Sequence, residues 1–533
     1  MELFGKSINY LDTDEWQVTE NGVYKCVNKQ MKYASPIPVI PTAVFMNIDS
    51  QVEKIELSFY KHKRWHSVIV PRSTIANKTK IISLADNGLE VNSDNAGMLV
   101  KYFADVVSNS LETLPHKPSK SVLGWVDGDF LPYTDSIAFD GEDTYKYLFQ
   151  AVKSKGTLEE WKEFIAPLRN KIEVRLMMAA AFASPLIELI GENPFVLHAF
   201  GGTGTAKTVS LLVAMSIFGD PAMGKLTRTM NMTANSMMST AAFLRNLPFA
   251  GDELQTIKSR WSNYDNLIMC ITEGVDRGRM SFDKVQETKA WKCSFIFTGE
   301  EPCIKPGSGG GVKNRVIEIE CNGKLVEHGN LTANFVKTHY GTAGKVYINS
   351  VKNYDLNSIY TGYFNMVLDG IDTTDKQAGS MALILTADKI SRELFWPEEA
   401  ELTLEDVSPY VARADEVDVS ERAYEFIRDA IAENVNNFIQ DEGGEDDKKK
   451  RSVWGKIECG SHVYFNNKTL NEVLSKEGYD FGAIKKKWAE RGHLEKDIKG
   501  NLRTMKRING TLVSCTCIVI SDECSDPADE LPF

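Results

Sequence analysis

The sequence predicts a multidomain protein with a parallel α/β core, a β-rich region before the core and a helix-helix-hairpin region after it. Short apolar runs of strand length alternate with helical stretches from about residue 193 to residue 340, as expected of a parallel sheet covered by helices. The chain has 533 residues. Single cores stop growing at about 250–300 residues, so about three or four domains are expected.

Residues 1–160 are predicted to form a β-rich N-terminal domain. Apolar runs with a period of two are separated by Pro, Gly and Asn: PIPVIPTAVFMNI, VEKIELSFY, WHSVIVP, TKIISL and SVLGWVDGDFLPY. In the last run Asp127 and Gly128 stand between two apolar halves, which predicts a tight hairpin turn.

Residues 161–345 are predicted to hold a helical segment followed by the α/β core. Thr157 and Glu160 have the spacing of a capping box and precede a long helical stretch. Beyond residue 193, four apolar runs predict the strands of the core: FVLHAF, LPFAGDE, KCSFIFTGE and RVIEIEC.

The remaining chain divides into four parts. Residues 346–440 have helical periodicity and are predicted to be a helical lid or connector. Residues 441–451 place acidic residues beside basic ones around two glycines, as in a solvated linker. Residues 452–520 hold two helical stretches and a strand pair turning at Asn509 and Gly510, which is typical of a winged-helix-like module; residues 521–533 form an acidic tail.

The stretch HAFGGTGTAKT lies between an apolar run and an apolar helix, which is the setting of a phosphate-binding loop. Lys207 is expected to reach the β and γ phosphates of ATP, and Thr208 to ligate Mg²⁺. A glycine-rich turn before a core helix is the alternative for this stretch alone. The loop residues expected to bind the nucleotide are Gly201, Gly202, Thr203, Gly204, Thr205, Ala206, Lys207 and Thr208.

Ala206 stands where the usual pattern has its last glycine. The position contributes a backbone N–H, which alanine retains, and it opens a helix, where alanine is favourable. We therefore expect Ala206→Gly to leave ATP binding nearly unchanged.

An acidic pair follows the phosphate loop at the end of the run NLPFAGDE. Asp252 is expected to hold Mg²⁺, and Glu253 to polarise the attacking water. Acidic pairs after apolar runs are common at protein surfaces. The pair therefore predicts a nucleotide site only in combination with the phosphate loop that precedes it.

Two further positions complete the predicted site. Thr298 ends the third run and is expected to contact the γ-phosphate or the water, with Glu300 as the second choice; strand capping is the alternative for both. Arg315 lies between a glycine-rich loop and the fourth run, a place suited to stabilising transition-state charge on the ATP of a neighbouring subunit. A surface salt bridge is the alternative for Arg315.

Composition and terminal sequence exclude other classes of protein. Nine cysteines occur without a CxxC pair or a His at metal-ligand spacing, so we expect free thiols, with no structural zinc site and no disulfide framework. The first residues lack the features of a signal peptide, and the apolar run 176–187 is too short to span a bilayer. The sequence thus predicts a cytoplasmic protein that has no membrane partner.

These motifs together resemble a known family. GGTGTAKT is similar to the phosphate loop of the MCM replicative helicases, AAA+ ATPases in which Ala-Lys-Ser or Ala-Lys-Thr is usual. The stretches LGW, NLPFAGDE, EGVDRGRM, FTGEEP and NRVIEIE resemble a phage and mobile-element family more closely. That family, catalogued as a domain of unknown function, includes the self-loading MCM-like helicases of staphylococcal cassette chromosomes. The resemblance covers about residues 120–520.

The resemblance implies an AAA+ core that assembles into a ring, a hexamer in this family, with ATP between subunits. Thr298 or Glu300 would be the sensor, and Arg315 would act in trans. Arg392 and Arg422 are only candidates for a second sensor. The cis half of the site would consist of Lys207, Thr208, Asp252 and Glu253.

A first DNA contact is predicted between the acidic pair and the third strand, in GVDRGRMSFDKVQETKAWKC. In MCM-like enzymes this interval supplies a hairpin that projects into the central channel, and a solvated charged loop is the alternative. The candidate residues are Arg277, Arg279, Lys284 and Lys289.

A second DNA contact is predicted in the C-terminal module. Residues 448–507 hold 16 Lys or Arg and 7 Asp or Glu, a net charge of +9 in a chain whose net charge is −12. A basic module on an acidic body is suited to docking on duplex DNA, with protein contact or solubility as the alternative. The candidates are Lys485, Lys486, Lys487, Arg491, Arg503, Lys506 and Arg507.

The tail SDECSDPADELPF resembles the acidic tip of bacterial single-stranded-DNA-binding proteins. In those proteins the terminal Phe and its carboxylate fit a pocket on replication and repair proteins, which are therefore expected partners. A disordered acidic end is the alternative.

The expectations favour an ATP-dependent DNA helicase, a ring-forming motor that uses ATP and Mg²⁺ and binds single- and double-stranded DNA. It would unwind DNA for the replication of a phage or mobile element. The alternative is a P-loop ATPase that acts as a switch, loader or defence protein and binds DNA without unwinding it.

Overall fold

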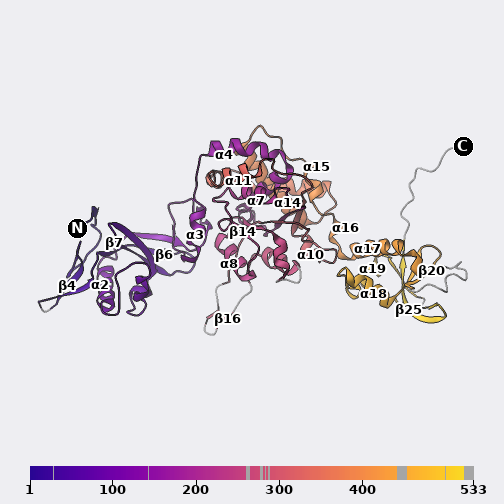
Figure 1. Cartoon of the computed structure of the whole chain (residues 1–533), viewed down its shortest axis with the longest axis horizontal. Helices are drawn as coiled ribbons and strands as arrows, with labels where there is room; N and C mark the ends of the chain where they lie inside the picture. The colour runs from indigo at the N-terminus through magenta and orange to yellow at the C-terminus, as the bar shows by residue number, and fades with distance from the viewer. Residues whose placement is uncertain are drawn as a thin grey trace. The chain divides into compact units, whose positions relative to one another are not determined.

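The computed structural model of the chain describes all residues except 28, 142, 260–263, 277–279, 282–283, 286–287, 441–452, 498–499 and 521–533. The chain divides into two compact units (Figure 1). The first contains residues 1–153 and 239–247, and the second contains residues 154–238 and 248–533. No helix in the described residues is long and apolar enough to cross a bilayer. The predicted linker 441–451 and the tail 521–533 lie outside the described residues.

The first unit has two main sheets, and its core also includes helix α2 (Ala96–Asn109). The five-stranded sheet has the spatial order β12 (Ala138–Phe139), β9 (His116–Lys120), β6 (Val39–Asn47), β7 (Glu53–Lys61), β8 (Arg64–Pro71). The three-stranded sheet is β3 (Trp16–Thr19), β4 (Gly22–Val27), β5 (Gln30–Ser35). Strands β6, β7 and β8 form an antiparallel meander and coincide with three predicted runs. The prediction of a β-rich N-terminal domain is thus confirmed.

Two local predictions in this unit have different outcomes. Strands β10 (Gly124–Val126) and β11 (Asp129–Leu131) form the expected hairpin, and the φ values of 48° at Asp127 and 85° at Gly128 fit a type I′ turn. The prediction of a strand in TKIISL is wrong, because this run forms a 3₁₀ helix, η1 (Ile81–Ala85). Its buried residues are three positions apart, which suits a 3₁₀ turn rather than the period of two of a strand.

The second unit contains a parallel five-stranded sheet. Its strands in spatial order are β14 (Thr227–Thr229), β15 (Phe249–Asp252), β18 (Phe295–Gly299), β13 (Val196–Phe200) and β19 (Val316–Glu320). The last four are the predicted runs. Sequence analysis missed β14, a three-residue edge strand with the polar sequence TRT. Because β18 lies between β13 and β15, the carboxyl ends of these three strands stand side by side.

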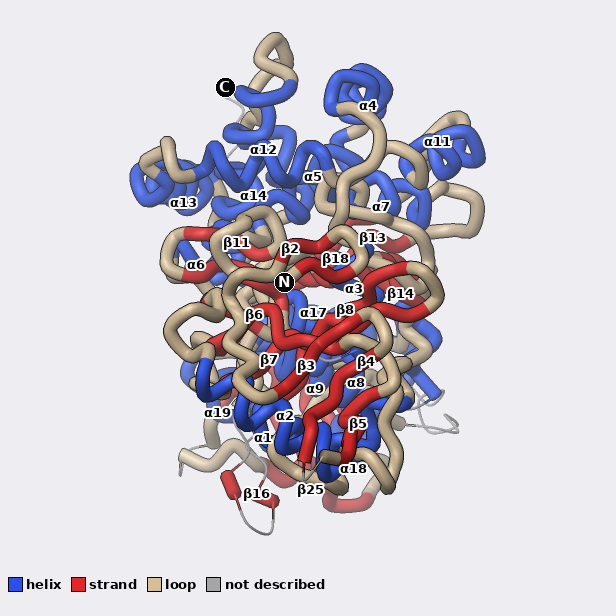
Figure 2. The backbone as a smooth tube through the Cα atoms, turned by 90° about the vertical axis from the view of Figure 1, so that its left-hand side faces the viewer, coloured by secondary structure: helices blue, strands red, loops and turns tan. Residues whose placement is uncertain are grey.

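Helix α5 (Ile172–Ala183) packs between this sheet and α14 (Asp375–Phe395). Residues 174–183 of α5 are all buried, because both sides of the helix are covered. Figure 2 shows α5 and α14 on one side of β13 and β18, together with α7 (Lys207–Met215), α12 (Thr342–Val351) and α13 (Leu356–Gly370). The predicted α/β core with a helical region beside it is therefore present.

The C-terminal module has its own apolar core. It holds α18 (Asn467–Lys476), α19 (Phe481–Glu490) and a hairpin of β24 (Thr504–Ile508) and β25 (Thr511–Val519), in the predicted order. Asn509 and Gly510 form its turn with φ values of 47° and 79°. Helix α17 (Val419–Glu433), assigned from sequence to the connector, packs into the same core through Ile427 and Ile431. The module therefore begins well before residue 452.

Candidate functional site

The phosphate-loop residues connect the end of β13 to the start of α7, as predicted. Gly201 has a φ of 143°, and a Cβ atom there would lie 2.6 Å from the carbonyl oxygen of Cys321. Gly204 has a φ of 89°. A Cβ atom at Gly202 or Gly204 would meet open space. Glycine is thus required for steric reasons at Gly201 and for its positive φ at Gly204, while Gly202 leaves the backbone of the loop accessible.

Lys207 folds back over this loop from the first position of α7. Its Nζ donates hydrogen bonds to the carbonyl oxygens of Gly201 at 2.7 Å and Gly202 at 2.8 Å. It also lies 3.0 Å from Oγ1 of Thr205. These contacts hold the ammonium group within the loop, where a phosphate oxygen could replace them with a stronger charge-assisted bond.

Ala206 has a φ of 69° and a ψ of 26°, which is the left-handed region. The expectation that alanine is favourable here because it opens a helix is therefore wrong: Ala206 is the N-cap, and the helix begins at Lys207. The left-handed conformation costs a non-glycine residue about 1–2 kcal/mol. This cost explains why the usual pattern has glycine at this position.

Thr208, Asp252 and Thr298 meet at the carboxyl edge of the sheet. Oγ1 of Thr208 donates to the Asp252 carboxylate, with both oxygens at 3.1 Å, and Oγ1 of Thr298 donates to Oδ1. Asp252 and Thr298 are only 8% and 1% exposed. A carboxylate and a hydroxyl on the loop side are the oxygen ligands that Mg²⁺ prefers, so the residues present fit this ion.

Glu253 differs from Asp252 in its surroundings. Its φ of 60° bends the chain directly after β15, and the residue is exposed. Among the described residues, no side chain donates a hydrogen bond to its carboxylate. Glu253 is therefore placed to accept a proton from a water molecule at the edge of the sheet.

The two sensor candidates contact different parts of the site. Thr298 bonds to Asp252, whereas Glu300 accepts a hydrogen bond of 3.0 Å from Oγ1 of Thr203 in the phosphate loop. The fold thus brings both candidates to the site, with Thr298 at the predicted magnesium ligand and Glu300 at the loop.

Arg315 lies at the opposite edge of the sheet. It precedes Val316, which pairs with Val196 at the start of β13, whereas the phosphate loop follows the end of β13. A five-residue strand is about 16 Å long, so the backbone of Arg315 lies about that far from its own phosphate loop. Its guanidinium contacts Sδ of Met269 at 3.4 Å and the carbonyl oxygen of Gly311. No carboxylate within the described residues forms an ion pair with it, contrary to the salt-bridge alternative.

The two second-sensor candidates are engaged elsewhere. Arg392 on α14 donates to the carbonyl oxygen of Glu399 at 3.2 Å and lies 3.7 Å from the carboxylate of Glu401. Arg422 on α17 donates to the carbonyl oxygens of Lys305, Pro306 and Ser308. The structure therefore supports neither arginine as a phosphate ligand.

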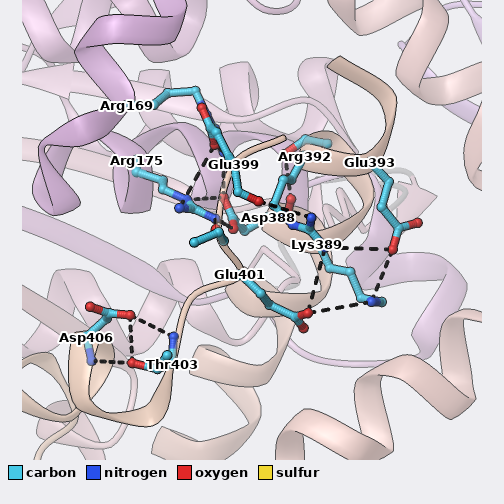
Figure 3. A network of polar contacts seen from close by, with 12 residues as sticks. Arg169, Arg175, Asp388, Lys389, Arg392, Glu393, Glu399, Glu401, Thr403 and Asp406 are labelled. Atoms are coloured by element: carbon cyan, nitrogen blue, oxygen red, sulfur yellow. Dashed lines mark hydrogen bonds and ion pairs between the residues drawn. The ribbon is translucent and has the colours of Figure 1, made fainter. Parts of the chain in front are cut away.

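A buried ion-pair network joins α14 to the segment before the sheet (Figure 3). Asp388 of α14 accepts a hydrogen bond from Arg169 at 2.9 Å and bonds from Arg175 of α5 to both carboxylate oxygens. Arg169 also donates to both oxygens of Glu399 at 3.0 Å. Sequence reasoning missed this network because its members are more than 200 residues apart.

The predicted hairpin between the acidic pair and the third strand is present. Val275 pairs with Ala290, and β16 (Met280–Ser281) pairs with β17 (Lys284–Val285) in antiparallel fashion. Arg277 and Arg279 lie outside the described residues, as does the side chain of Lys284, and Lys289 is exposed.

The structure divides the basic candidates of the C-terminal module. Arg491 bonds to Asp418 at 2.6 Å, and Lys487 lies 3.5 Å from the same carboxylate. Lys506 pairs with Glu458 at 2.6 Å. These three form ion pairs within the protein, and their assignment as DNA contacts stays a prediction. The candidates that form no ion pair with another element in the described part of the chain are Lys485, Lys486, Arg503 and Arg507.

A protein-family model described as "Domain of unknown function (DUF927)" matches residues 16–289. The chain belongs to the DUF927 family. A second model, the Cch helix turn helix domain, matches residues 418–523. This range includes α17, in agreement with the packing of that helix in the C-terminal core. The resemblance to a mobile-element family catalogued as a domain of unknown function is thus confirmed.

The DUF927 chain is also similar to solved structures. One described as "SCCmec type IV Cch - active helicase" has a TM-score of 0.70 and 16% sequence identity over 97% of this chain and 98% of that one. At this identity the likeness shows a shared fold. The A form apo structure of the NrS-1 C terminal region has a TM-score of 0.32 and 13% identity over 91% and 96% of the two chains. No curated protein sequence matches the chain.

Proposed function

We propose that this protein is an ATP-dependent DNA helicase that forms a ring and opens DNA for the replication of a phage or mobile element. One observation carries the proposal: the residues for ATP binding and hydrolysis converge at one edge of the sheet, while Arg315 stands at the other without an ion-pair partner in the described residues. A site divided in this way is completed by a neighbouring copy of the chain. Rings, and hexamers in particular, supply every copy with such a neighbour.

Each residue of the site has a role that follows from its position. Lys207 would bind the β and γ phosphates in place of its present carbonyl contacts. Thr208 and Asp252 would hold Mg²⁺, which would neutralise charge on the phosphates. Glu253 would orient the attacking water, and Thr298 would align the Asp252 carboxylate. Arg315 of one subunit would stabilise the transition-state charge on the ATP of the next.

DNA is the proposed substrate for three reasons. The overall fold is similar to that of a structure described as an active helicase. The C-terminal module matches a helix-turn-helix model and carries exposed basic residues, which suit duplex DNA. The hairpin of β16 and β17 lies between the acidic pair and β18. We expect a motor of this kind to contact a single DNA strand through this hairpin.

Unwinding of a forked duplex by the full-length chain tests the proposal. Lys207→Ala and Glu253→Gln should each abolish strand separation, and single-stranded DNA should raise the ATPase rate of the unaltered protein. Lys389→Ala, which changes a partly exposed ion pair on α14, is the matched control and should unwind normally. ATP hydrolysis that is independent of DNA, without strand separation, would contradict the proposal and favour a switch or loader.

A further inference from the structure

Three residues that are far apart in the sequence meet behind the phosphate loop. His198 of β13 and Glu318 of β19 are register partners in the parallel sheet, so their side chains point to the same face. Cys303 reaches the same place from the segment that follows β18. One ligand atom from each residue lies within 4.8 Å of the other two. His198 and Cys303 are almost fully buried, at 0% and 1% exposure.

The imidazole of His198 is not satisfied by its surroundings. Neither Nδ1 nor Nε2 has a hydrogen-bond partner within the described residues, and the nearest carboxylate oxygen, Oε1 of Glu318, is 3.5 Å from Nδ1. Oε1 of Gln255 is also buried without a partner. Buried polar atoms are almost always paired in proteins. The nitrogens of His198 and Oε1 of Gln255 therefore call for a further polar partner.

Glu318 does not provide a hydrogen bond to either nitrogen of His198. Its carboxylate accepts hydrogen bonds from the backbone N–H groups of Cys303 at 2.9 Å and Ile304 at 3.3 Å. These bonds fix the carboxylate beside the thiol, but they leave both imidazole nitrogens of His198 unpaired. The cluster thus combines an oriented carboxylate, a thiol and an imidazole whose Nδ1 faces that carboxylate at 3.5 Å.

We propose that His198, Cys303 and Glu318 bind one Zn²⁺ ion. Zinc is the metal that a mixed set of imidazole nitrogen, thiolate sulfur and carboxylate oxygen favours, with water as the fourth ligand. Bonds of about 2.0–2.3 Å in a tetrahedron separate ligand atoms by about 3.3–3.6 Å. The three side chains need to close by about 1 Å, which small rotations about their χ angles can supply. Cys303 loses its thiol proton to water on binding.

The surroundings of His198 fit a role as a zinc ligand. Nδ1 faces Glu318 and would bind the ion, which leaves Nε2–H on the side of Gly299. A Cβ atom on Gly299 would lie 2.8 Å from this Nε2 and 3.3 Å from Oε1 of Gln255. The Gln255 oxygen is thus a buried acceptor near the same glycine, although it does not form a hydrogen bond with Nε2 in the present arrangement. A carbonyl acceptor for the second nitrogen is the usual support of a metal-bound histidine.

The ion would join three segments that carry the ATPase site. His198 is three residues before Gly201, Cys303 is three residues after Glu300, and Glu318 is three residues after Arg315. A single Zn²⁺ would therefore connect β13, which leads into the phosphate loop, the segment that follows β18, and β19, which follows Arg315. The ion would hold these segments together, and its site is distinct from the Mg²⁺ site proposed at Asp252.

Metal analysis of the full-length chain, purified without a polyhistidine tag, tests the proposal. After incubation with Zn²⁺ in excess Mg²⁺ and removal of free metal, we expect about one zinc per chain by mass spectrometry. Cys303→Ala and His198→Phe should lose the zinc. Cys293→Ala is the matched control, because Cys293 is equally buried but lies before β18, and it should keep the zinc. Retention of zinc by Cys303→Ala, or equal loss in Cys293→Ala, would overturn the proposal.

Cobalt substitution provides a test that needs no variant to fold. Co²⁺ bound at this site should show the near-ultraviolet charge-transfer band of a thiolate ligand, because the sulfur of Cys303 coordinates it. Co²⁺ at the Thr208–Asp252 site has only oxygen ligands and gives no such band. Zn²⁺ should also raise the melting temperature of the unaltered chain. Absence of the thiolate band at saturating Co²⁺ would overturn the proposal independently of any change in ATPase activity.

Discussion

Ala206 shows how one backbone conformation decides what a substitution does. The chain passes from β13 into α7 through a residue with positive φ, and the methyl group of Ala206 is strained there. Asp252 is a second example, because its proposed role as a magnesium ligand depends on the two hydroxyls that hold it. In both cases the residue type was evident from the sequence. The positive φ of Ala206 and the hydroxyl partners of Asp252 could be found only in the fold.

Ala206→Gly should relieve the strain of the left-handed conformation, about 1–2 kcal/mol, while the more flexible unfolded chain offsets about 0.5–1 kcal/mol. We expect a free energy of unfolding that is unchanged or up to about 1.5 kcal/mol higher. The affinity for a fluorescent ATP analogue should change less than about twofold, because the backbone N–H remains. Ala206→Val is the control and should lower stability, since a β-branched residue tolerates this region poorly. A large loss of ATP binding in Ala206→Gly would mean that the methyl group has a packing role.

Elements were predictable from the sequence where their signal is local. Strands β13, β15, β18 and β19 are short apolar runs, and the two I′ hairpins follow from Asp127–Gly128 and Asn509–Gly510. Helix α17 was recognised as a helix but assigned to the wrong domain, because an apolar face does not reveal its partner. The pairing of Asp388 with two arginines, and the cluster at His198, depend on contacts between distant segments and leave no local pattern.

Asp388 should be the residue on which the attachment of α14 to α5 depends. Asp388→Asn leaves Arg169 and Arg175 buried without their shared carboxylate, so the free energy of unfolding should fall by about 3–5 kcal/mol. Glu393→Gln on the same helix is the control, since its i,i+4 pair with Lys389 is partly exposed to solvent and should contribute less than about 0.5 kcal/mol. Urea denaturation followed by circular dichroism measures both changes. Equal stability of the two variants would show that the network does not hold the helices together.

Variants of basic residues on α19 and on the β24–β25 hairpin should separate DNA contacts from structural ion pairs. Combined Lys486→Ala and Arg507→Ala should weaken duplex binding and reduce the slope of log affinity against log salt by about 1–2, as expected for two lost phosphate contacts. Arg491→Ala should mainly lower stability. Burial alone would raise the pKa of the Asp418 carboxyl. Hydrogen bonds from the Ser420 N–H and from Arg491 outweigh this effect, so the pKa is lowered below its ordinary value.

Fluorescence anisotropy over a range of NaCl concentrations measures the salt slope for these variants. A larger loss of DNA affinity in Arg491→Ala than in the double variant would reverse the assignment.

At the scale of the whole molecule, the proposed division of the ATPase site between two edges of one sheet would link hydrolysis to assembly. A monomer has the phosphate loop, the acidic pair and Thr298 on one side and Arg315 about a strand's length away. Each copy in a ring would therefore be a catalyst at one face and an activator at the other. Defects in the two halves should then be separable, because they affect different interfaces.

Mixing two inactive variants tests this separation. Lys207→Ala destroys the cis half and Arg315→Ala the trans half, so a ring of both has interfaces where an intact loop from one variant faces an intact arginine from the other. With random assembly at equal amounts, roughly a quarter of the interfaces are of this kind, and we expect a corresponding share of the normal ATPase rate. Lys207→Ala mixed with Glu253→Gln is the control, because both defects lie in the cis half and no interface is restored. If the first mixture stays as inactive as the second at every ratio, Arg315 does not act on a neighbouring subunit.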